Sequence, residues 1–372
     1  MSSFEVTRRA FLGALGAAGV VGVPGSADAS DASPGDDIGS FLDRNAGEGD
    51  GVRIPPGTYR WDGSGLDVDT TVAGAGTPGD VVLELQSGSM DGYVRGTLEN
   101  VVVRGANPEP KAGIDLHPGG VIDGFCWPEG GGENQDRGIY HPSGGRRTTI
   151  RNTCVAGMAN NGAYVDKAPV TVDNCAFLNN NVANLRVGHS DGSYADAVSY
   201  IRNSLVAVTN DIRVGNKGLT NPIGLRILYS GRFFVEDSWF VFTEGAPSCD
   251  GLVELRGEGI TVEFRNCHFH NDTANDVVRD TGSDNQVTFS NCTVSGEGRT
   301  AVSEPSVSGS LARDTVQVPL PSGVTGVPQA NKAYGFELAH LPSVSRRGGG
   351  DPHHNRPPHR FGGRVDGTSA DG

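Results

Sequence analysis

The chain has 372 residues, of which 56 are glycine and 21 are proline, and its formal net charge at pH 7 is −14. Glycine and proline form about a fifth of the chain, which argues against a mainly helical protein and indicates many turns. The acidic excess leaves no contiguous basic surface for phosphates, so we expect no nucleic-acid partner.

Residues 1–29 have the features of a twin-arginine signal peptide. Residues 7–12 (TRRAFL) hold two adjacent arginines, an uncharged run follows over 13–25, and residues 27–29 offer a cleavage site of small residues. The alternative is a membrane anchor, but a glycine-rich run of roughly 15 residues is shorter than a bilayer-spanning helix. We therefore expect a secreted or cell-surface protein with no transmembrane segment in the mature chain.

Arginine replaces lysine in most of the chain. Only four of the 30 basic residues are lysines, namely Lys111, Lys167, Lys217 and Lys332. An acidic, lysine-poor chain is typical of a halophilic protein, because salt screens the repulsion between like charges. The alternative is an ordinary acidic secreted protein from a GC-rich genome.

One six-residue segment recurs along the middle of the chain. Its pattern is an apolar residue, a polar residue, Asn or Asp, a small residue, any residue and an apolar residue. Six copies begin at Ile150, Val172, Ile201, Val235, Phe264 and Phe289, and a weaker copy begins at Leu98. Successive Asn or Asp positions are 22, 29, 34, 29 and 25 residues apart, starting from Asn152. This spacing is too irregular for a helical solenoid and fits stacked β-coils with loops of variable length.

The pattern predicts an all-β fold, a right-handed single-stranded parallel β-helix of about nine to ten coils over residues 36–300. Each Asn would occupy a bend between two strands and hydrogen-bond its equivalents in neighbouring coils, about 4.8 Å away. The small residue after it, and the apolar residue three positions after it, would form internal stacks. A β-sandwich is the alternative, but it does not require Asn at the same phase in every repeat.

The chain resembles the pectin-lyase-like superfamily of right-handed β-helices over about residues 36–300. The repeated Asn segments carry this resemblance, together with a short capping helix expected over 38–45 and the segment Val52–Tyr59 (VRIPPGTY), which is similar to the first coil of such proteins. The export signal, the acidity and the scarcity of lysine resemble the haloarchaeal members.

The repeat ends near Thr300. We expect a C-terminal cap or linker over 301–339 and a disordered, Gly- and Pro-rich tail over 340–372. Three histidines of this tail, His353, His354 and His359, offer a metal site or, as the simpler alternative, belong to a solvated segment.

The six cysteines do not form metal-binding C-x-x-C pairs. Cys175, Cys267 and Cys292 share the small inward position of the repeat, which predicts buried core thiols. Neighbouring coils would also bring Cys267 and Cys292 within disulfide range.

The first strand of each coil predicts an outward ladder of side chains. Its inward residues would be Ile114, Ile139, Ala163, Leu185 and Leu225. The outward ladder would then be Asp115, Tyr140, Tyr164, Arg186 and Arg226, with His117, Asp166, Lys167 and His189 two or three residues further along. Tyr rings stack on sugars and Arg pairs with carboxylates, so the ladder suits an extracellular acidic polysaccharide. The alternative is a mixed-charge, solvated surface.

Three long segments would border this ladder, over 127–137, 189–197 and 209–223. Irregular loops beside one row of strands favour a functional face. We expect the protein to act on a polysaccharide in this groove as a monomer.

Two catalytic schemes are considered for this face. A hydrolase of the polygalacturonase type needs several carboxylates, but only Gly188-His189 is similar to that family's Gly-His-Gly motif, and the single Asp36-Asp37 pair precedes the coils.

A lyase needs a base and cations, often Ca²⁺, that stabilise the enolate. Asp115 and Asp166 are candidates to hold Ca²⁺, Arg186 or Lys167 to contact the uronate carboxylate, and Tyr164 or His189 to move the proton. His117, Tyr140 and Arg226 would bind substrate. The competing class is a non-catalytic glycan-binding or structural protein of the cell surface.

Overall fold

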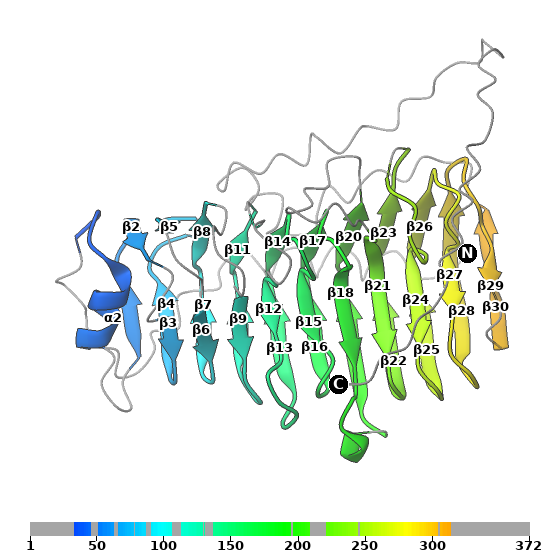
Figure 1. Ribbon diagram of the computed structural model, residues 1–372, viewed down its shortest axis with the longest axis horizontal. Helices are drawn as coiled ribbons and strands as arrows, with labels where there is room; N and C mark the ends of the chain where they lie inside the picture. Colours follow the sequence, from blue (N-terminus) through cyan, green and yellow to red (C-terminus); the bar gives the residue numbers. More distant parts are fainter. Residues whose placement is uncertain are drawn as a thin grey trace, which may run out of the picture.

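The computed structural model describes residues 33–45, 51–62, 66–77, 79–86, 91–105, 113–128, 130, 137–194, 196–208, 221–244, 246–303 and 306–313. The predicted signal peptide (1–29), the tail (340–372) and residues 314–339 lie outside this part. In the described part the chain winds into one elongated parallel β-helix, with α2 (Ile38–Asn45) over its N-terminal end (Figure 1). The predicted all-β parallel β-helix with a short N-terminal capping helix is confirmed.

The strands form three faces. The first face is a separate sheet of ten parallel strands: β3 (Leu66–Val68), β6 (Asp91–Val94), β9 (Gly113–Leu116), β12 (Ile139–Tyr140), β15 (Ala163–Val165), β18 (Ala183–Gly188), β21 (Ile223–Leu228), β24 (Val253–Arg256), β27 (Val278–Asp280) and β29 (Val302–Ser303).

The other two faces belong to one continuous sheet. The second face contains β1 (Val52–Ile54), β4 (Thr71–Gly74), β7 (Thr97–Glu99), β10 (Val121–Asp123), β13 (Thr148–Arg151), β16 (Val170–Asp173), β19 (Val198–Arg202), β22 (Gly231–Glu236) and β25 (Ile260–Arg265). The third face contains β2 (Gly57–Trp61), β5 (Val81–Leu85), β8 (Val102–Arg104), β11 (Cys126–Trp127), β14 (Cys154–Ala156), β17 (Ala176–Leu178), β20 (Leu205–Val208), β23 (Trp239–Phe242) and β26 (His268–Asn271). The long strands β28 (Gln286–Ser295) and β30 (Ser306–Arg313) bend across both faces.

Within the described residues, eight successive turns carry three separate strands each, from β3–β5 to β24–β26, with partial turns at both ends. This agrees with the expected number of coils. Parallel pairing continues to Arg313, beyond the position near 300 where the sequence repeat fades.

The recurring Asn occupies the bend between the second and third faces with a positive φ. The φ angles lie between 48° and 53° at Asn100, Asn152, Asn174, Asn203, Asp237, Asn266 and Asn291. Asn and Asp tolerate this left-handed conformation better than other residues with a Cβ. In the turn without an Asn copy, Gly124 takes the position with φ 68°, and a Cβ there would lie 2.6 Å from Asn100 Oδ1.

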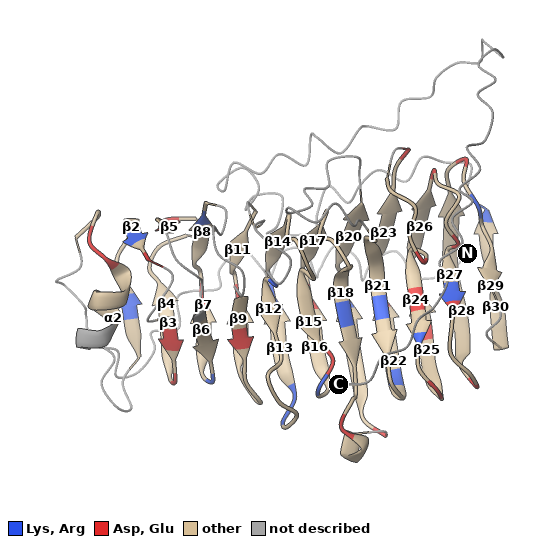
Figure 2. Ribbon diagram, in the orientation of Figure 1, with Lys and Arg blue, Asp and Glu red and all other residues tan. Residues whose placement is uncertain are grey.

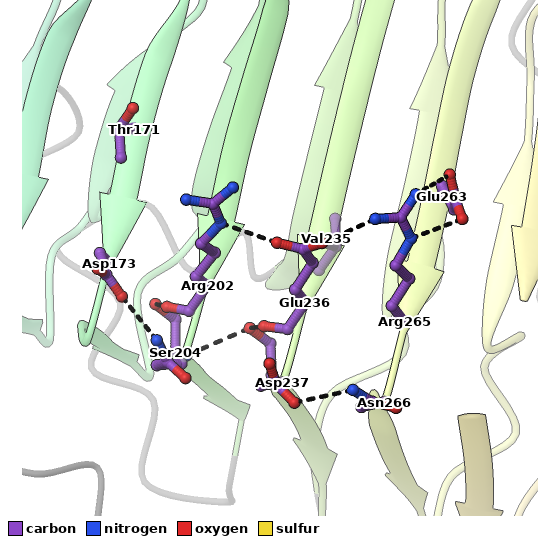
Figure 3. Close-up of polar contacts among 12 residues, drawn as sticks. Thr171, Asp173, Arg202, Ser204, Val235, Glu236, Asp237, Glu263, Arg265 and Asn266 are labelled. Atoms are coloured by element: carbon purple, nitrogen blue, oxygen red, sulfur yellow. Dashed lines mark hydrogen bonds and ion pairs between the residues drawn. The ribbon is translucent and has the colours of Figure 1, made fainter. Parts of the chain in front are cut away.

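The side chains at this bend hydrogen-bond from turn to turn, as the repeat predicts. Asn174 Nδ2 donates to Asn152 Oδ1 at 2.7 Å, and Asn291 Nδ2 donates to Asn266 Oδ1 at 2.8 Å. Asn203 departs from the ladder, because its amide donates to Asp173 Oδ1 instead (2.9 Å). Figure 3 shows this corner, with Asp237 accepting a bond from Asn266.

The interior is filled by stacked side chains of the predicted repeat. The small residues after the Asn and the apolar residues three positions after it are buried, including Ser204, Cys267, Val155 and Phe177. Further along the axis, Phe240 stacks on Phe269 with 5.2 Å between ring centroids. The predicted internal rows are therefore confirmed.

The predicted core thiols Cys175, Cys267 and Cys292 are buried, and all six cysteines of the chain are free. Burial raises the pKa of Cys175, which disfavours the reactive thiolate. Cys126 and Cys154 are direct cross-strand partners in a second, smaller apolar cluster on the outward side of the third face.

The Asn ladder gives a stability prediction at Asn266, whose amide donates to Asp237 and accepts from Asn291. Asn266→Ala should lower the free energy of unfolding by about 2 kcal/mol, because it adds left-handed strain to the lost hydrogen bonds. Asn266→Gly should cost about 1 kcal/mol, because glycine adopts the same φ without strain. Urea denaturation of both variants measures the difference. Equal losses would show that the backbone conformation does not limit stability here.

Candidate functional site

One outward row of side chains runs along the whole first face. Its members are aligned by strand register in the order Asp67, Tyr93, Asp115, Tyr140, Tyr164, Arg186, Arg226, Glu254, Arg279. The five predicted ladder residues lie in the predicted order. Figure 2 shows that β3, β9 and β24 carry acidic residues on this face, whereas β18 and β21 carry basic ones.

The sequence prediction missed the two ends of the row. Asp67 and Tyr93 precede its first predicted member, and Glu254 and Arg279 follow its last. The sequence Val253-Glu254-Leu255 carried a usable pattern, because an acid between two apolar residues predicts an outward side chain. In the structure both Val253 and Leu255 are buried.

The row faces outward because the strands alternate. In β15 the residues on either side of Tyr164, Ala163 and Val165, are completely buried, while Tyr164 is half-buried. Ile139 pairs with Ala163 in the interior and Tyr140 pairs with Tyr164 outside. A period of two residues therefore places both tyrosines on the same surface.

Two tyrosines and two arginines form the centre of the row. Tyr140 and Tyr164 meet edge to face, with 5.2 Å between ring centroids. The guanidinium carbon of Arg137 lies 4.5 Å from the Tyr140 centroid and 5.0 Å from that of Tyr164. Arg186 lies closer, with 3.7 Å between its guanidinium carbon and the Tyr164 centroid. Two cations thus lie against the Tyr164 ring.

Asp166 holds Arg186 in this position. Arg186 donates to Asp166 Oδ2 from Nε (2.9 Å) and from Nη2 (2.8 Å). The Asp166 side chain has no exposed surface, whereas that of Arg186 keeps 14% of its surface exposed. Burial raises the pKa of Asp166, although Arg186 opposes that shift. The pair fixes the guanidinium of this partly exposed side chain beside the tyrosine.

The Tyr164 phenol is held in its protonated form. Burial raises the pKa of Tyr164, and the neighbouring Asp166 carboxylate raises it further, while Arg186 opposes the shift. The side chain is therefore suited to donate a proton rather than to act as a phenolate base.

The next pair along the row is more deeply buried. Arg226 Nε donates to Glu254 Oε2, and the two side chains keep only 6% and 2% of their surface exposed. Arg226 is thus neutralised by a residue of its own row. This corrects the expectation of an outward arginine available to substrate.

The N-terminal part of the row contains a smaller aromatic cluster. His117 meets Tyr93 edge to face at 5.7 Å, and Arg95 lies 4.2 Å over the same tyrosine. Asp69 accepts hydrogen bonds from both Tyr93 and Arg95 at 2.9 Å. His117 therefore lies on the outward side, as predicted.

The structure places His189 inside the helix and not on the outward face, which corrects the prediction. Only 1% of His189 is exposed, its ring stacks on Phe233 at 4.9 Å, and its Nε2 lies 2.9 Å from Ser199 Oγ. Burial lowers the pKa of His189 to about 4. His189 is a core histidine in contact with apolar neighbours.

Lys167 is half-buried and lies near another internal histidine. Burial lowers the pKa of His141 to about 3, and the positive charge of Lys167 contributes to this shift. The structure therefore associates Lys167 with the strand end and the interior rather than with the centre of the outward row.

The structure does not bring Asp115 and Asp166 together as a cation site. They belong to strands two turns apart, roughly 10 Å along the axis, and Asp166 is already paired with Arg186. In the described ranges, no group of three or more His, Cys, Asp or Glu side chains is arranged to hold a metal ion. Among the helices described, none is long and apolar enough to cross a membrane.

Long connections lead into or out of three strands of the first face. The connection over 128–138 enters β12 and that over 209–222 enters β21, while 189–197 leaves β18. The last of these contains a short 3₁₀ helix, Gly192–Tyr194. The other two lie partly outside the described residues.

Comparison with known proteins gives a distant structural likeness. No protein-family model matches the chain, and no curated protein matches it. The A-module of the mannuronan C-5 epimerase AlgE6 from Azotobacter vinelandii is similar over 75% of this chain and 95% of that chain, with 14% sequence identity and a TM-score of 0.32.

The buried His189 predicts acid sensitivity. Its pKa is about 4 in the folded protein and 6.5 ordinarily, so the unfolded chain binds a proton that the folded chain resists. The stability contribution is present above pH 6.5 and is lost as the pH falls toward 4. The free energy of unfolding falls when the pH is lowered from 7 to 5, and His189→Gln should make this fall smaller by about 2 kcal/mol. Denaturation at both pH values measures this, and an unchanged loss in the variant would contradict it.

Proposed function

We propose that the outward row of β12, β15, β18 and β21 binds an acidic polysaccharide, and that Tyr164 and Arg186 act on one uronate unit by lyase-type elimination. The observation that supports this most directly is the Tyr164–Arg186–Asp166 arrangement. Tyr164 offers an aromatic ring and a protonated phenol on the outward side of β15, and Asp166 fixes the Arg186 cation beside it. Each group has a separate role toward a sugar acid.

The row suits an extended ligand because its groups repeat along the helix axis. Tyr140, Tyr164 and Arg186 are direct neighbours in register, so successive turns present successive contacts. The rings contact sugar carbons, and the exposed edge of the guanidinium pairs with a carboxylate. A polymer lying along the row would thus be bound by several turns at once.

Elimination suits the central groups better than hydrolysis. In elimination, a solvent water or hydroxide would take the proton from the carbon beside the uronate carboxyl group, and Arg186 would stabilise the negative charge that develops there. The bond to the leaving oxygen then breaks, and that oxygen takes the proton of the Tyr164 phenol, which solvent later restores. Hydrolysis needs two available carboxyl groups about 5 to 9.5 Å apart. Two acids on the outward side of this face, Asp166 and Glu254, are each bound to an arginine and buried.

The second candidate is a non-catalytic glycan-binding or structural protein of the cell surface. The pairing and burial of Arg226 and Glu254 favour a structural role, because a neutralised arginine and acid leave fewer groups for chemistry on this face. Both candidates use the same face, and they differ in whether Tyr164 transfers a proton.

We further propose that the protein acts outside the membrane after twin-arginine export, in a saline environment, and that it belongs with the pectin-lyase-like β-helices. The motif at residues 7–12, the net charge of −14 and the repeated Asn segments support these assignments. Detection of a mature N-terminus near residue 30 in the culture medium would test export.

A product assay separates the two functions. Acidic polysaccharides are incubated with the full chain at high salt, with and without Ca²⁺, and absorbance at about 235 nm reports the unsaturated ends that elimination produces. New reducing ends without this absorbance would indicate hydrolysis and contradict the elimination. Retention on the polysaccharide without either product would indicate the binding protein.

Arg186→Ala should weaken binding of the acidic polysaccharide at least tenfold, because a charge-assisted contact contributes roughly 1.5 to 3 kcal/mol. Affinity electrophoresis measures this. Arg202→Ala is the matched control, since Arg202 also stacks on a tyrosine and pairs with an acid, but on the second face. Equal weakening by the two variants would contradict an assigned role for the first face.

Tyr164→Phe should separate binding from chemistry. The ring and its contacts with both arginines remain, so affinity should change by less than about threefold, whereas elimination should fall by roughly 100-fold or more when the proton donor is lost. Full elimination activity in this variant would remove Tyr164 from the mechanism.

A further inference from the structure

The third face becomes polar at its C-terminal end. Its outward residues are small or apolar from β11 to β20, including Cys154, Ala176 and Leu205. On β26 and β28 the same rows present histidines and hydroxyls, where His268 pairs with Thr293 and His270 pairs with Ser295. This region lies on a different face from the proposed polysaccharide row.

Ser295, His270 and Asp272 form one hydrogen-bonded chain. His270 Nδ1 lies 3.0 Å from Ser295 Oγ, and His270 Nε2 lies 2.9 Å from Asp272 Oδ2. An ionised carboxylate only accepts hydrogen bonds, so the Asp272 contact places the imidazole proton on Nε2. Nδ1 is then free of a proton and accepts the hydroxyl proton of Ser295. The order is that of a nucleophile, a base and an orienting acid.

Backbone contacts fix the acid. Asp272 Oδ1 accepts a hydrogen bond from the Glu297 amide at 3.0 Å. Gly296, which lies between Ser295 and Glu297, has φ 96°, and a Cβ there would lie 2.3 Å from the Asn271 carbonyl oxygen. The turn after Ser295 therefore requires glycine and brings the Glu297 amide to the carboxylate. Asp272 is held toward the histidine.

A cation lies beside the same turn. Arg313 Nη2 donates to the carbonyl oxygen of Gly296, the residue after Ser295, at 3.4 Å. The His270 and Asp272 side chains keep 12% and 19% of their surface exposed and Ser295 keeps 7%, so the chain reaches solvent mainly through the imidazole and the carboxylate. A positive charge beside the turn that follows the serine suits an oxyanion that forms during acyl transfer.

We propose that Ser295, His270 and Asp272 form an ester-hydrolysing site for small acyl esters, such as an acetyl ester of a sugar hydroxyl. Ser295 Oγ attacks the ester carbonyl carbon while its proton moves to His270 Nδ1. The C–O bond to the alcohol breaks, and the alcohol leaves with that proton. Water then attacks the acyl-serine, its proton passes through Nδ1 to Ser295 Oγ, and the carboxylic acid is released. Asp272 is a positioning residue, and Arg313 stabilises the oxyanion.

The neighbouring His268 provides a matched control. Its Nδ1 lies 2.7 Å from Thr293 Oγ1, which is the same pairing two residues away on the same two strands, and its ring stacks on Trp239 at 5.7 Å. General catalysis by any imidazole on this face would involve both histidines equally. Catalysis by the proposed site involves only His270.

The first test is hydrolysis of 4-nitrophenyl acetate by the full chain. Ser295→Ala and His270→Gln should each reduce the rate by roughly 100-fold or more, while His268→Gln should leave it within twofold. Unfolding midpoints close to that of the parent protein verify that the variants are folded. Equal rates for the parent and Ser295→Ala, or equal losses in the two histidine variants, would overturn the proposal.

The second test needs no variant. A fluorophosphonate probe should label the unmodified protein once, and peptide mass spectrometry should place the adduct on Ser295. Failure to label, or labelling at another serine, would overturn the site. Polysaccharide binding in the Ser295→Ala variant should be unchanged, so this proposal and that for the first face stand or fall separately.

Discussion

The left-handed Asn bend between the second and third faces is the constraint on which the rest of the structure depends. Each turn must change direction at a defined residue, and Asn or Asp tolerates the required φ while most side chains resist it. Amide contacts such as Asn174 to Asn152 then link one turn to the next. Because a slip of one residue would move every side chain to the opposite side of its strand, this anchoring also determines which side chains face outward.

The three faces use the same register in different ways. On the second face, outward charges alternate and neutralise one another: Glu236 accepts hydrogen bonds from Arg202 and Arg265, and Glu263 accepts from Arg265 (Figure 3). On the third face, apolar rows change to imidazole and hydroxyl pairs. On the first face, two arginines lie against Tyr164, and a buried acid fixes one of them, Arg186. Identical backbone geometry therefore supports a charge network, an apolar surface and a candidate binding row.

The sequence predicted the parts of the fold that repeat at a fixed phase. The Asn position identified the bend, and alternation such as that of Ala163 and Tyr164 identified the buried side of the first-face strands. Gly124 was not recognised as a member of the series, because glycine satisfies the same φ without an amide. The position of the bend can thus be predicted from the sequence only where an Asn or Asp marks it.

The sequence predicted the candidate site less completely. Alternation gave Tyr140, Tyr164 and Arg186 correctly. His189 was assigned to the outward side although it shares the inward phase of Leu185 and Val187, and in the structure it packs on Phe233. It also could not show that Arg226 is neutralised. Glu254 lies beside Arg226 because β21 and β24 pair in this register, and the variable loop lengths between strands hide that register in the sequence. The contact of His270 with Ser295 likewise depends on register between strands, which the spacing of residues along the chain does not reveal.

The most direct test of this account is a crystal structure of the protein with a bound acidic oligosaccharide. The account predicts sugar density along β12, β15, β18 and β21, with a carboxylate at the exposed edge of Arg186 and a sugar ring against Tyr140 or Tyr164. Density confined to the second or third face, or an Arg186 guanidinium untouched by ligand that occupies the first face, would contradict it.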